Sequence, residues 1–147
     1  MYQNAVSCAH MEETIFMKII RREIPAEIIY EDDDTLAFLD ISPTNQGHTL
    51  VIPKKPVRNV FDSDAATWAA VMETVRKIAP AIRDGVGATG VNINSNHGAD
   101  AGQEVFHLHA HIIPRFAKEE FTLWPKKEYA PGEAGAVAEK IRTNLTK

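Results

Sequence analysis

Three histidines alternate with apolar residues in the segment Val105–Pro114, which reads VFHLHAHIIP. Successive side chains of a β-strand point to opposite faces, so His107, His109 and His111 are expected to share one face. The apolar residues between them then form the other face, which must be covered by a core. We predict a strand over Glu104–Pro114, with neighbouring imidazoles about 6.5 to 7 Å apart along it.

Two kinds of chemistry use imidazoles in such a row. Imidazole binds zinc and copper, and two histidines of a strand can supply two ligands. A neutral imidazole can also attack phosphorus, while its neighbours donate hydrogen bonds to the phosphate oxygens. Side chains of one flat strand converge poorly on a single ion, and the loop 96–103 can present backbone N–H groups to an anion. The pattern therefore favours phosphate chemistry over metal binding.

The apolar periodicity along the chain predicts an α+β fold. Short connections join most of the strands, which favours an antiparallel sheet of five strands, one long helix and shorter terminal helices. The expected strands are Ile28–Tyr30, Thr35–Ile41, His48–Ile52, Thr89–Ser95 and Glu104–Pro114, and the expected helices are Thr14–Ile20, a long helix from the N-cap Asp64 to Gly85, and Ala134–Leu145.

Composition excludes several classes of protein. A chain of 147 residues suits one domain, which we place at residues 11–147 after a disordered tail at 1–10. The net charge is −4 and basic residues cluster only in pairs, which argues against nucleic-acid binding. Uninterrupted apolar runs are too short for a membrane span. Cys8 is the only cysteine and the N-terminus lacks a secretory pattern, so a cytoplasmic location is expected.

The histidine segment resembles the histidine triad (HIT) superfamily, whose motif is His-φ-His-φ-His-φ-φ with φ apolar. The motif stands here at His107–Ile113. Three further blocks resemble the Hint branch, the histidine triad nucleotide-binding proteins: Thr14–Ala26, Leu36–Pro43 and His48–Lys55. The resemblance covers about residues 13–116, whereas residues 117–147 diverge.

The resemblance implies a HIT-like protomer that forms a homodimer. It also implies binding of a purine nucleotide such as AMP or GMP, and hydrolysis of its phosphoramidate or anhydride derivatives at the α-phosphorus. In the family the middle histidine is the nucleophile, so His109 would carry a covalent nucleotidyl-histidine intermediate. His111 would hydrogen-bond the phosphate, and His107 and His48 would support the central ring. No cofactor is implied.

The resemblance also implies a nucleotide-binding set. Asp40 matches the ribose-binding carboxylate, and Asn96 and the backbone near Gly102 and Gln103 match the phosphate-binding loop. The base and sugar pocket matches Ile15, Phe16, Ile19, Phe38, Leu39 and Ile41. Considered alone, these apolar residues suit a plain core equally well, because a core edge and a base pocket use the same side chains. His97 has no supporting pattern and is expected to be exposed.

Two departures from the Hint pattern affect the interpretation. Many bacterial relatives have Cys-x-x-Cys where this chain has Thr14 and Met17, so no structural zinc is expected. Glu104 stands where the branch commonly has serine, and a carboxylate facing a phosphate would repel it. Strand parity places Glu104 opposite the histidines, so we hypothesise that it contributes only its backbone or turns away. By its position it is still counted in the nucleotide-binding set.

Other functions compatible with the sequence are a nucleotide-binding regulatory or interaction module with weak catalysis, a dinucleoside polyphosphate hydrolase, and a metal-dependent hydrolase that uses His107 and His109. All three histidines of the motif are intact, which argues against the regulatory module. In the Hint branch the C-terminus shapes specificity across the dimer, and Trp124-Pro125 is a candidate for this role here.

Overall fold

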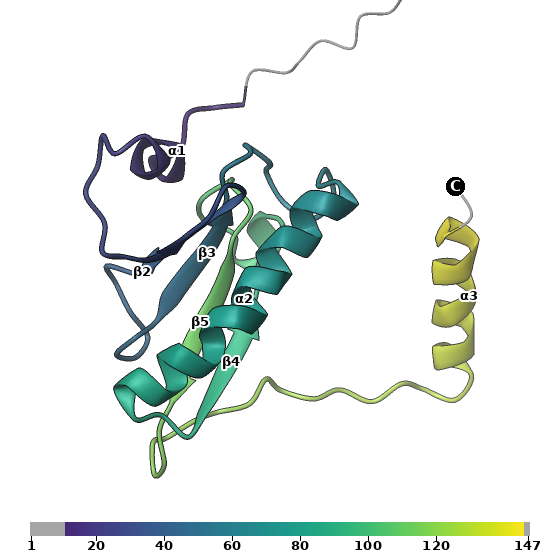
Figure 1. Cartoon of the computed structure of the whole chain (residues 1–147). Helices are drawn as coiled ribbons and strands as arrows, with labels where there is room; N and C mark the ends of the chain where they lie inside the picture. The colour runs from purple at the N-terminus through teal and green to yellow at the C-terminus, as the bar shows by residue number, and fades with distance from the viewer. Residues whose placement is uncertain (1–10, 146–147) are drawn as a thin grey trace, which may run out of the picture.

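A computed structural model describes residues 11–145, and it confirms an α+β fold with a five-stranded antiparallel sheet (Figure 1). The strands lie in the order β1-β2-β3-β5-β4, and each neighbouring pair is antiparallel. Along the chain the elements are α1 (Ile15–Ile20), β1 (Ile28–Glu31), β2 (Thr35–Leu39), β3 (Thr49–Pro53), α2 (Ala65–Val86), β4 (Gly90–Asn94), the 3-10 turn η1 (Ala99–Ala101), β5 (Ala110–Arg115) and α3 (Glu133–Leu145). The predicted tail at residues 1–10 lies outside the described residues.

The first two helices begin and end at residues suited to those positions. The Thr14 side chain accepts a hydrogen bond from the Met17 N–H at the start of α1. Asp64 does the same for the Thr67 N–H at the start of α2, at 2.7 Å. Gly87 ends α2 with a φ of +71°, a left-handed conformation that glycine adopts at little cost. Asp64 is thus confirmed as the N-cap of the long helix.

The sheet separates two apolar layers. On one face α2 packs Val71, Val75, Ile78 and Ile82 against the sheet, together with Leu108, Ala110 and Ile112 of the histidine segment. On the other face Phe16 and Ile19 of α1 pack against Leu36, Phe38, Leu50 and Ile52. Both faces of β2 and β3 are therefore covered, which explains why their sequences TLAFL and TLVIP are almost continuously apolar.

The predicted fifth strand is too long. Strand β5 begins at Ala110, so Glu104–His109 is not part of the sheet. Its pairing with β3 covers only the register from Thr49↔Ile112 to Val51↔Ala110. Pro56 follows β3, and the segment after it forms no strand that could pair with residues 104–109. An isolated hydrogen bond joins the two segments instead, in which the Leu108 N–H donates to the Val57 carbonyl at 2.7 Å.

Strand β2 also ends earlier than predicted, at Leu39 rather than Ile41. The side chain of Asp40 accepts a hydrogen bond from the Ser42 N–H at 2.8 Å, and this local bond turns the chain out of the sheet. Asp40 therefore lies at the end of β2, beside the face of the sheet that α1 covers. Its carboxylate is half-buried.

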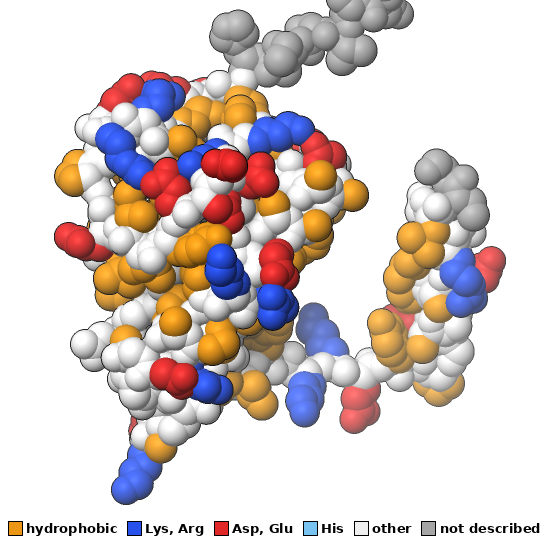
Figure 2. Space-filling view, viewed as in Figure 1, with side chains coloured by type: hydrophobic (Ala, Val, Ile, Leu, Met, Phe, Trp, Pro, Cys, Tyr) orange, Lys and Arg blue, Asp and Glu red, His pale blue; other side chains and the backbone are white. Residues whose placement is uncertain are grey.

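The last segment of the chain stands away from the body of the protein (Figure 1). Residues 117–132 form no helix or strand, and none of the residues of α3 is buried. Figure 2 shows apolar side chains on the surface of α3. Ile141 and Leu145 of this helix are 58% and 76% exposed. The same view shows basic and acidic side chains interspersed over the body. Between residues 11 and 145, no helix has the length and apolar character needed to cross a bilayer.

Candidate functional site

A groove of about 500 Å³ opens on the face of the sheet that carries α1. It is lined by α1, the end of β2, the loop before the histidine segment, and β5. Every residue of the predicted nucleotide-binding set except Gln103 lines it: Ile15, Phe16, Ile19, Phe38, Leu39, Asp40, Ile41, Asn96, Gly102 and Glu104. Of the predicted catalytic residues, His109 and His111 line the groove, whereas His107 and His48 lie behind it.

The three histidines of the motif do lie on one side of the chain, although only His111 belongs to a strand. The Phe16 ring from α1 meets His109 edge-on at a centroid distance of 5.1 Å and His107 at 6.1 Å. The ring centroids of His109 and His111 are 5.0 Å apart. Leu108, between His107 and His109, packs in the α2 layer instead. Residues 107–109 therefore keep the alternation of faces that the sequence predicts, without the hydrogen bonds of a sheet.

Backbone carbonyls fix the protons of two rings. His109 Nδ1 lies 2.7 Å from the carbonyl oxygen of His107, which can only accept, so Nδ1 carries the proton. The Nε2 atom of a neutral His109 then holds a free lone pair. His107 Nε2 likewise donates to the Pro53 carbonyl at 2.8 Å, and its Nδ1 has no hydrogen-bond partner among the described residues.

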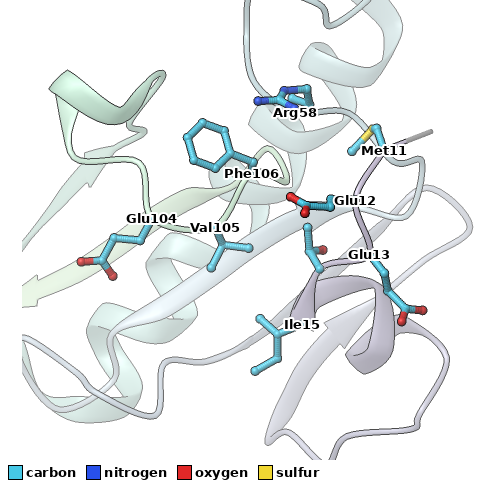
Figure 3. Close-up of a pocket in the computed structure, with 9 residues that line it drawn as sticks. Met11, Glu12, Glu13, Ile15, Arg58, Glu104, Val105 and Phe106 are labelled. Carbon is cyan, nitrogen blue, oxygen red and sulfur yellow. The ribbon is translucent and has the colours of Figure 1, made fainter. Parts of the chain in front are cut away.

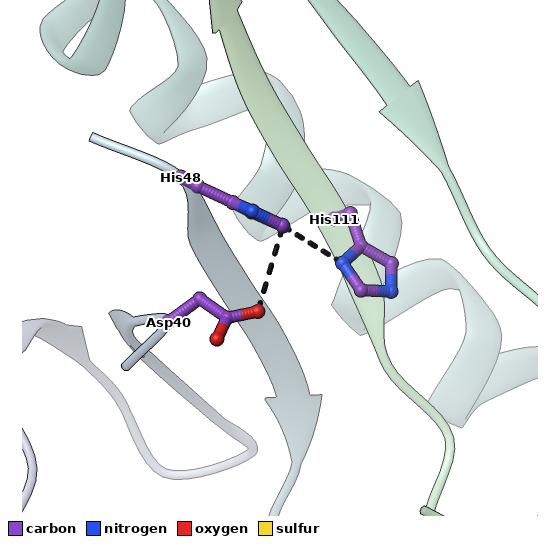
Figure 4. A group of neighbouring side chains, drawn as sticks. All are labelled: Asp40, His48 and His111. Carbon is purple, nitrogen blue, oxygen red and sulfur yellow. Dashed lines mark hydrogen bonds and ion pairs between the residues drawn. The ribbon is translucent and has the colours of Figure 1, made fainter. Parts of the chain in front are cut away.

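A second chain of hydrogen bonds fixes the proton of His111 (Figure 4). The Thr44 N–H donates to His48 Nδ1 at 3.0 Å, so the proton of a neutral His48 is on Nε2. That Nε2 lies 2.9 Å from His111 Nδ1 and donates to it. His111 Nδ1 is thus an acceptor, and a neutral His111 carries its proton on Nε2. The site therefore combines one imidazole with a free lone pair, His109, and one with a free N–H, His111.

Burial keeps these imidazoles neutral near pH 7. It lowers the pKa of His109, against the opposing effect of the hydrogen bond to the His107 carbonyl. Burial, then the neighbouring rings of His109 and His48, lowers the pKa of His111 to about 4. Burial also lowers the pKa of His48 and His107. A neutral ring is the form that can act as a nucleophile, so the environment suits that chemistry.

Among the described residues, one group of three side chains has its ligand atoms close enough to share a cation: Asp40, His48 and His111 (Figure 4). The nearest oxygen of Asp40 is 3.7 Å from His48 Nε2. A metal on that Nε2 would need the His48 proton to move to Nδ1, where the Thr44 N–H already donates. These three side chains therefore fit a cation poorly. Their arrangement does place Asp40, the predicted ribose-binding carboxylate, beside His48 and His111.

Two residues have surroundings that the sequence does not predict. Gln103 is buried behind the groove and does not line it, so its side chain does not face a ligand there. His97 is half-buried rather than exposed: its Nδ1 accepts from the Val60 N–H at 3.0 Å, and its ring packs on Trp68 and Phe61. Both join the loop 96–103 to the segment after β3, and no sequence pattern indicates such a connection.

Glu104 borders the groove. The parity argument fails because residue 104 precedes the strand by several residues. The same side chain also lines a second cavity of about 410 Å³ beside the groove (Figure 3). That cavity is bordered by Glu12 and Glu13 on one side, and by Phe106 with the Arg58 guanidinium 5.1 Å from its ring centroid on the other.

Residues missed by the sequence also shape the site. Ser95 Oγ donates to the His109 carbonyl at 2.6 Å and so fixes the backbone of that histidine. Ile24, Pro25 and Ala26 form the groove wall after α1. The apolar residues around Pro25 could have indicated this wall in the sequence. A single serine near a strand end, such as Ser95, gives no such indication of a role in the site.

The chain belongs to the HIT family, because residues 21–118 match the HIT domain. It is 50% identical over 138 residues to the protein named hit of Bacillus subtilis, an alignment that covers 91% of this chain and 95% of that protein. It is 37% identical to adenosine 5'-monophosphoramidase hnt1 of Schizosaccharomyces pombe, with 89% of this chain and 97% of that one covered. Adenylylsulfatase HINT3 of Arabidopsis thaliana is 42% identical over 76% of this chain, which spans 56% of that protein.

A solved structure has the same fold. The crystal structure of SMU.412c from Streptococcus mutans superposes with a TM-score of 0.87 at 41% identity, covering 95% of this chain and 89% of that one. This agreement extends over most of the described chain and confirms the HIT-like architecture.

Proposed function

We propose that the protein hydrolyses purine nucleotide derivatives at the α-phosphorus, with His109 as the nucleophile. The observation that carries the proposal is the fixed tautomer of His109, whose free Nε2 belongs to a ring at the wall of the groove. Two of the relatives are named an adenosine 5'-monophosphoramidase and an adenylylsulfatase. Both names contain an adenylyl group joined to a different leaving group.

In the proposed first step, His109 Nε2 forms a bond to phosphorus and the leaving group departs with its electron pair, to be protonated from solvent. The His111 Nε2–H donates a hydrogen bond to a phosphate oxygen, which stabilises the charge that develops there. In the second step water attacks phosphorus and gives up a proton to solvent, the phosphorus–nitrogen bond breaks with its electron pair returning to His109 Nε2, and the nucleoside monophosphate is released. Neither step needs a proton relocated within the site beforehand.

The rest of the groove suits the nucleoside. The half-buried Asp40 carboxylate can accept hydrogen bonds from two vicinal ribose hydroxyls. Ile41 and Ile15 are 88% and 44% exposed, and both border the groove. A flat base between them would cover apolar surface that is now in contact with water, which favours binding. The base preference for purines rests on the family resemblance.

A substrate panel tests this proposal. Adenosine and guanosine phosphoramidates, adenylyl sulfate and dinucleoside polyphosphates are compared by kcat/KM, with the metal chelator EDTA present and absent. We expect turnover of the phosphoramidates that EDTA does not change. Loss of turnover with EDTA would support a metal-dependent hydrolase instead, and AMP binding without turnover of any substrate would support the regulatory module.

The activity is expected to fall in acid, with the midpoint of kcat/KM below 6.5. Protonation of His109 removes the nucleophilic lone pair, and burial lowers the pKa of this ring from its ordinary value of 6.5. The activity should therefore be retained as the pH falls through 6.5 and be lost only below it. A profile of kcat/KM from about pH 4.5 to 8 measures the midpoint in the free enzyme. A midpoint at or above 6.5 would contradict a buried neutral nucleophile.

Replacing Glu104 by serine is expected to tighten AMP binding by about two- to fivefold, most clearly at low salt, because an exposed carboxylate beside a phosphate is weakly repulsive. Isothermal titration calorimetry of Glu104→Ser measures the effect. The matched control is Glu12→Ser, a glutamate that borders the second cavity but not the groove (Figure 3). Unchanged affinity and turnover in Glu104→Ser would show that this carboxylate takes no direct part.

We also propose that the working form is a homodimer in which residues 11–147 act as one domain. The arm 117–132 and α3 leave Leu123, Trp124, Ile141 and Leu145 between 58% and 85% exposed. A second chain could cover these side chains, and the arm would then bring Trp124-Pro125 to a neighbouring subunit. This arrangement is consistent with the family resemblance.

A further inference from the structure

We propose that Gln103 is a positioning residue for the reaction, which holds the histidine segment in place from behind and never touches the nucleotide. The inference rests on the proposed function and goes beyond it. The resemblance implies nucleotide binding by the backbone at this residue, whereas the inference concerns its side chain. Its basis is a single buried amide whose hydrogen bonds take the place of the missing sheet ladder.

The side chain of Gln103 is 4% exposed and fully hydrogen-bonded. Its Oε1 accepts from the Gly98 N–H at 2.9 Å and from Asn59 Nδ2 at 3.2 Å. Its Nε2 donates to the Arg58 carbonyl at 2.7 Å and to the Val105 carbonyl at 3.1 Å. A primary amide has two donors and room for two accepted bonds, so no capacity remains for a phosphate oxygen.

These four bonds join three segments of the chain. Gly98 belongs to the loop that borders the groove, Arg58 and Asn59 follow β3, and Val105 lies two residues before His107. The segment after β3 holds the histidine segment at a further point, because Val57 C=O accepts from the Leu108 N–H. The non-strand part of the histidine segment is therefore fixed along one side by Gln103 and by the Val57 carbonyl.

The connection to chemistry passes through the carbonyl of His107. That oxygen accepts from His109 Nδ1 and thereby places the free lone pair on Nε2. If the backbone near Val105 shifts, the His107 carbonyl turns and the His109 ring loses both its orientation and its single tautomer. A displacement of about 1 Å at a reacting group can lower a rate by about 100-fold.

Replacing Gln103 by alanine tests this role. We expect kcat for an adenosine phosphoramidate to fall by about 10- to 100-fold while the AMP dissociation constant is unchanged. Gln103→Asn keeps the amide on a shorter stem and should recover part of kcat. The matched control is Gln46→Ala, the same substitution at an exposed turn.

A second readout does not need turnover. The ¹⁵N chemical shifts of the His109 ring distinguish its two neutral tautomers, and the wild type should show only the Nδ1–H form. Gln103→Ala should show a mixture. If the wild type hydrolyses no nucleotide, the proposed function fails, and this spectrum still decides whether Gln103 positions the ring.

Three results would overturn the proposal. One is an AMP dissociation constant that rises in proportion to the loss of kcat/KM, as expected for a direct ligand. Another is a variant that melts at a lower temperature but keeps the wild-type kcat and the single tautomer below its transition, as expected for a purely structural residue. If Gln103→Ala does not fold, Gln103→Asn decides, and wild-type kcat with a single tautomer in that variant would contradict the positioning role.

Discussion

Replacing His109 by alanine is expected to lower kcat by about 10⁴-fold or more while AMP still binds, because the substitution removes the only atom proposed to bond to phosphorus. The groove walls and Asp40 remain, so most contacts to the nucleoside are kept. Single-turnover kinetics on an adenosine phosphoramidate and calorimetric titration with AMP measure the two quantities separately.

A second variant at the same position tests the chemical role directly. His109→Gly leaves a space in the wall of the groove, and imidazole added to the solution should restore part of the turnover by attacking phosphorus from that space. Full activity in either variant would exclude His109 as the nucleophile. Loss of activity together with loss of AMP binding would indicate that the ring holds the groove open instead.

Replacing Ile112 by alanine is expected to lower the free energy of unfolding by about 2–5 kcal/mol, the range for removing a large aliphatic side chain from a core. Ile112 is completely buried and lies at the centre of the sheet, where β5 pairs with both β3 and β4. Its side chain is part of the layer beneath α2, opposite the groove. Urea denaturation followed by circular dichroism measures the change.

The matched control is Ile29→Ala, the same substitution in β1 at a side chain that is 44% exposed. The free energy of unfolding should fall clearly less in this variant, because the side chain of Ile29 is already in contact with water. Equal losses at the two positions would contradict the description of the core. The Tm of Ile112→Ala should fall by roughly 4–20 °C, since a chain of this size loses about 2–4 °C per kcal/mol.

The alternation of residues 105–114 was sufficient to predict which residues share a face, but not which of them form a strand. The alternation of faces persists at His107, Leu108 and His109, although these residues have no partner strand. Whether residues 104–109 pair as a strand depends on the segment of the chain that lies beside them. In that segment Pro56, which has no N–H, follows β3. The parity argument for Glu104 fails for the same reason.

The groove itself was largely predictable from the resemblance, because apolar blocks and Asp40 mark its walls. Gln103 and His97 were not, since a polar side chain looks the same in a sequence whether it faces a ligand or saturates a buried backbone. Their surroundings come from residues 57–60, about 40 positions away, and only the folded chain brings these segments together.

The groups that orient His107 and His109 have a consequence for how the site tolerates mutation. Both acceptors are main-chain carbonyls, of Pro53 and His107, rather than the carboxylates that orient histidines in many enzymes. No substitution removes a carbonyl, so an alanine scan would pass over the atoms that set these two tautomers. The tautomers of His107 and His109 are set by the path of the backbone, and they persist through any side-chain change that leaves this path intact.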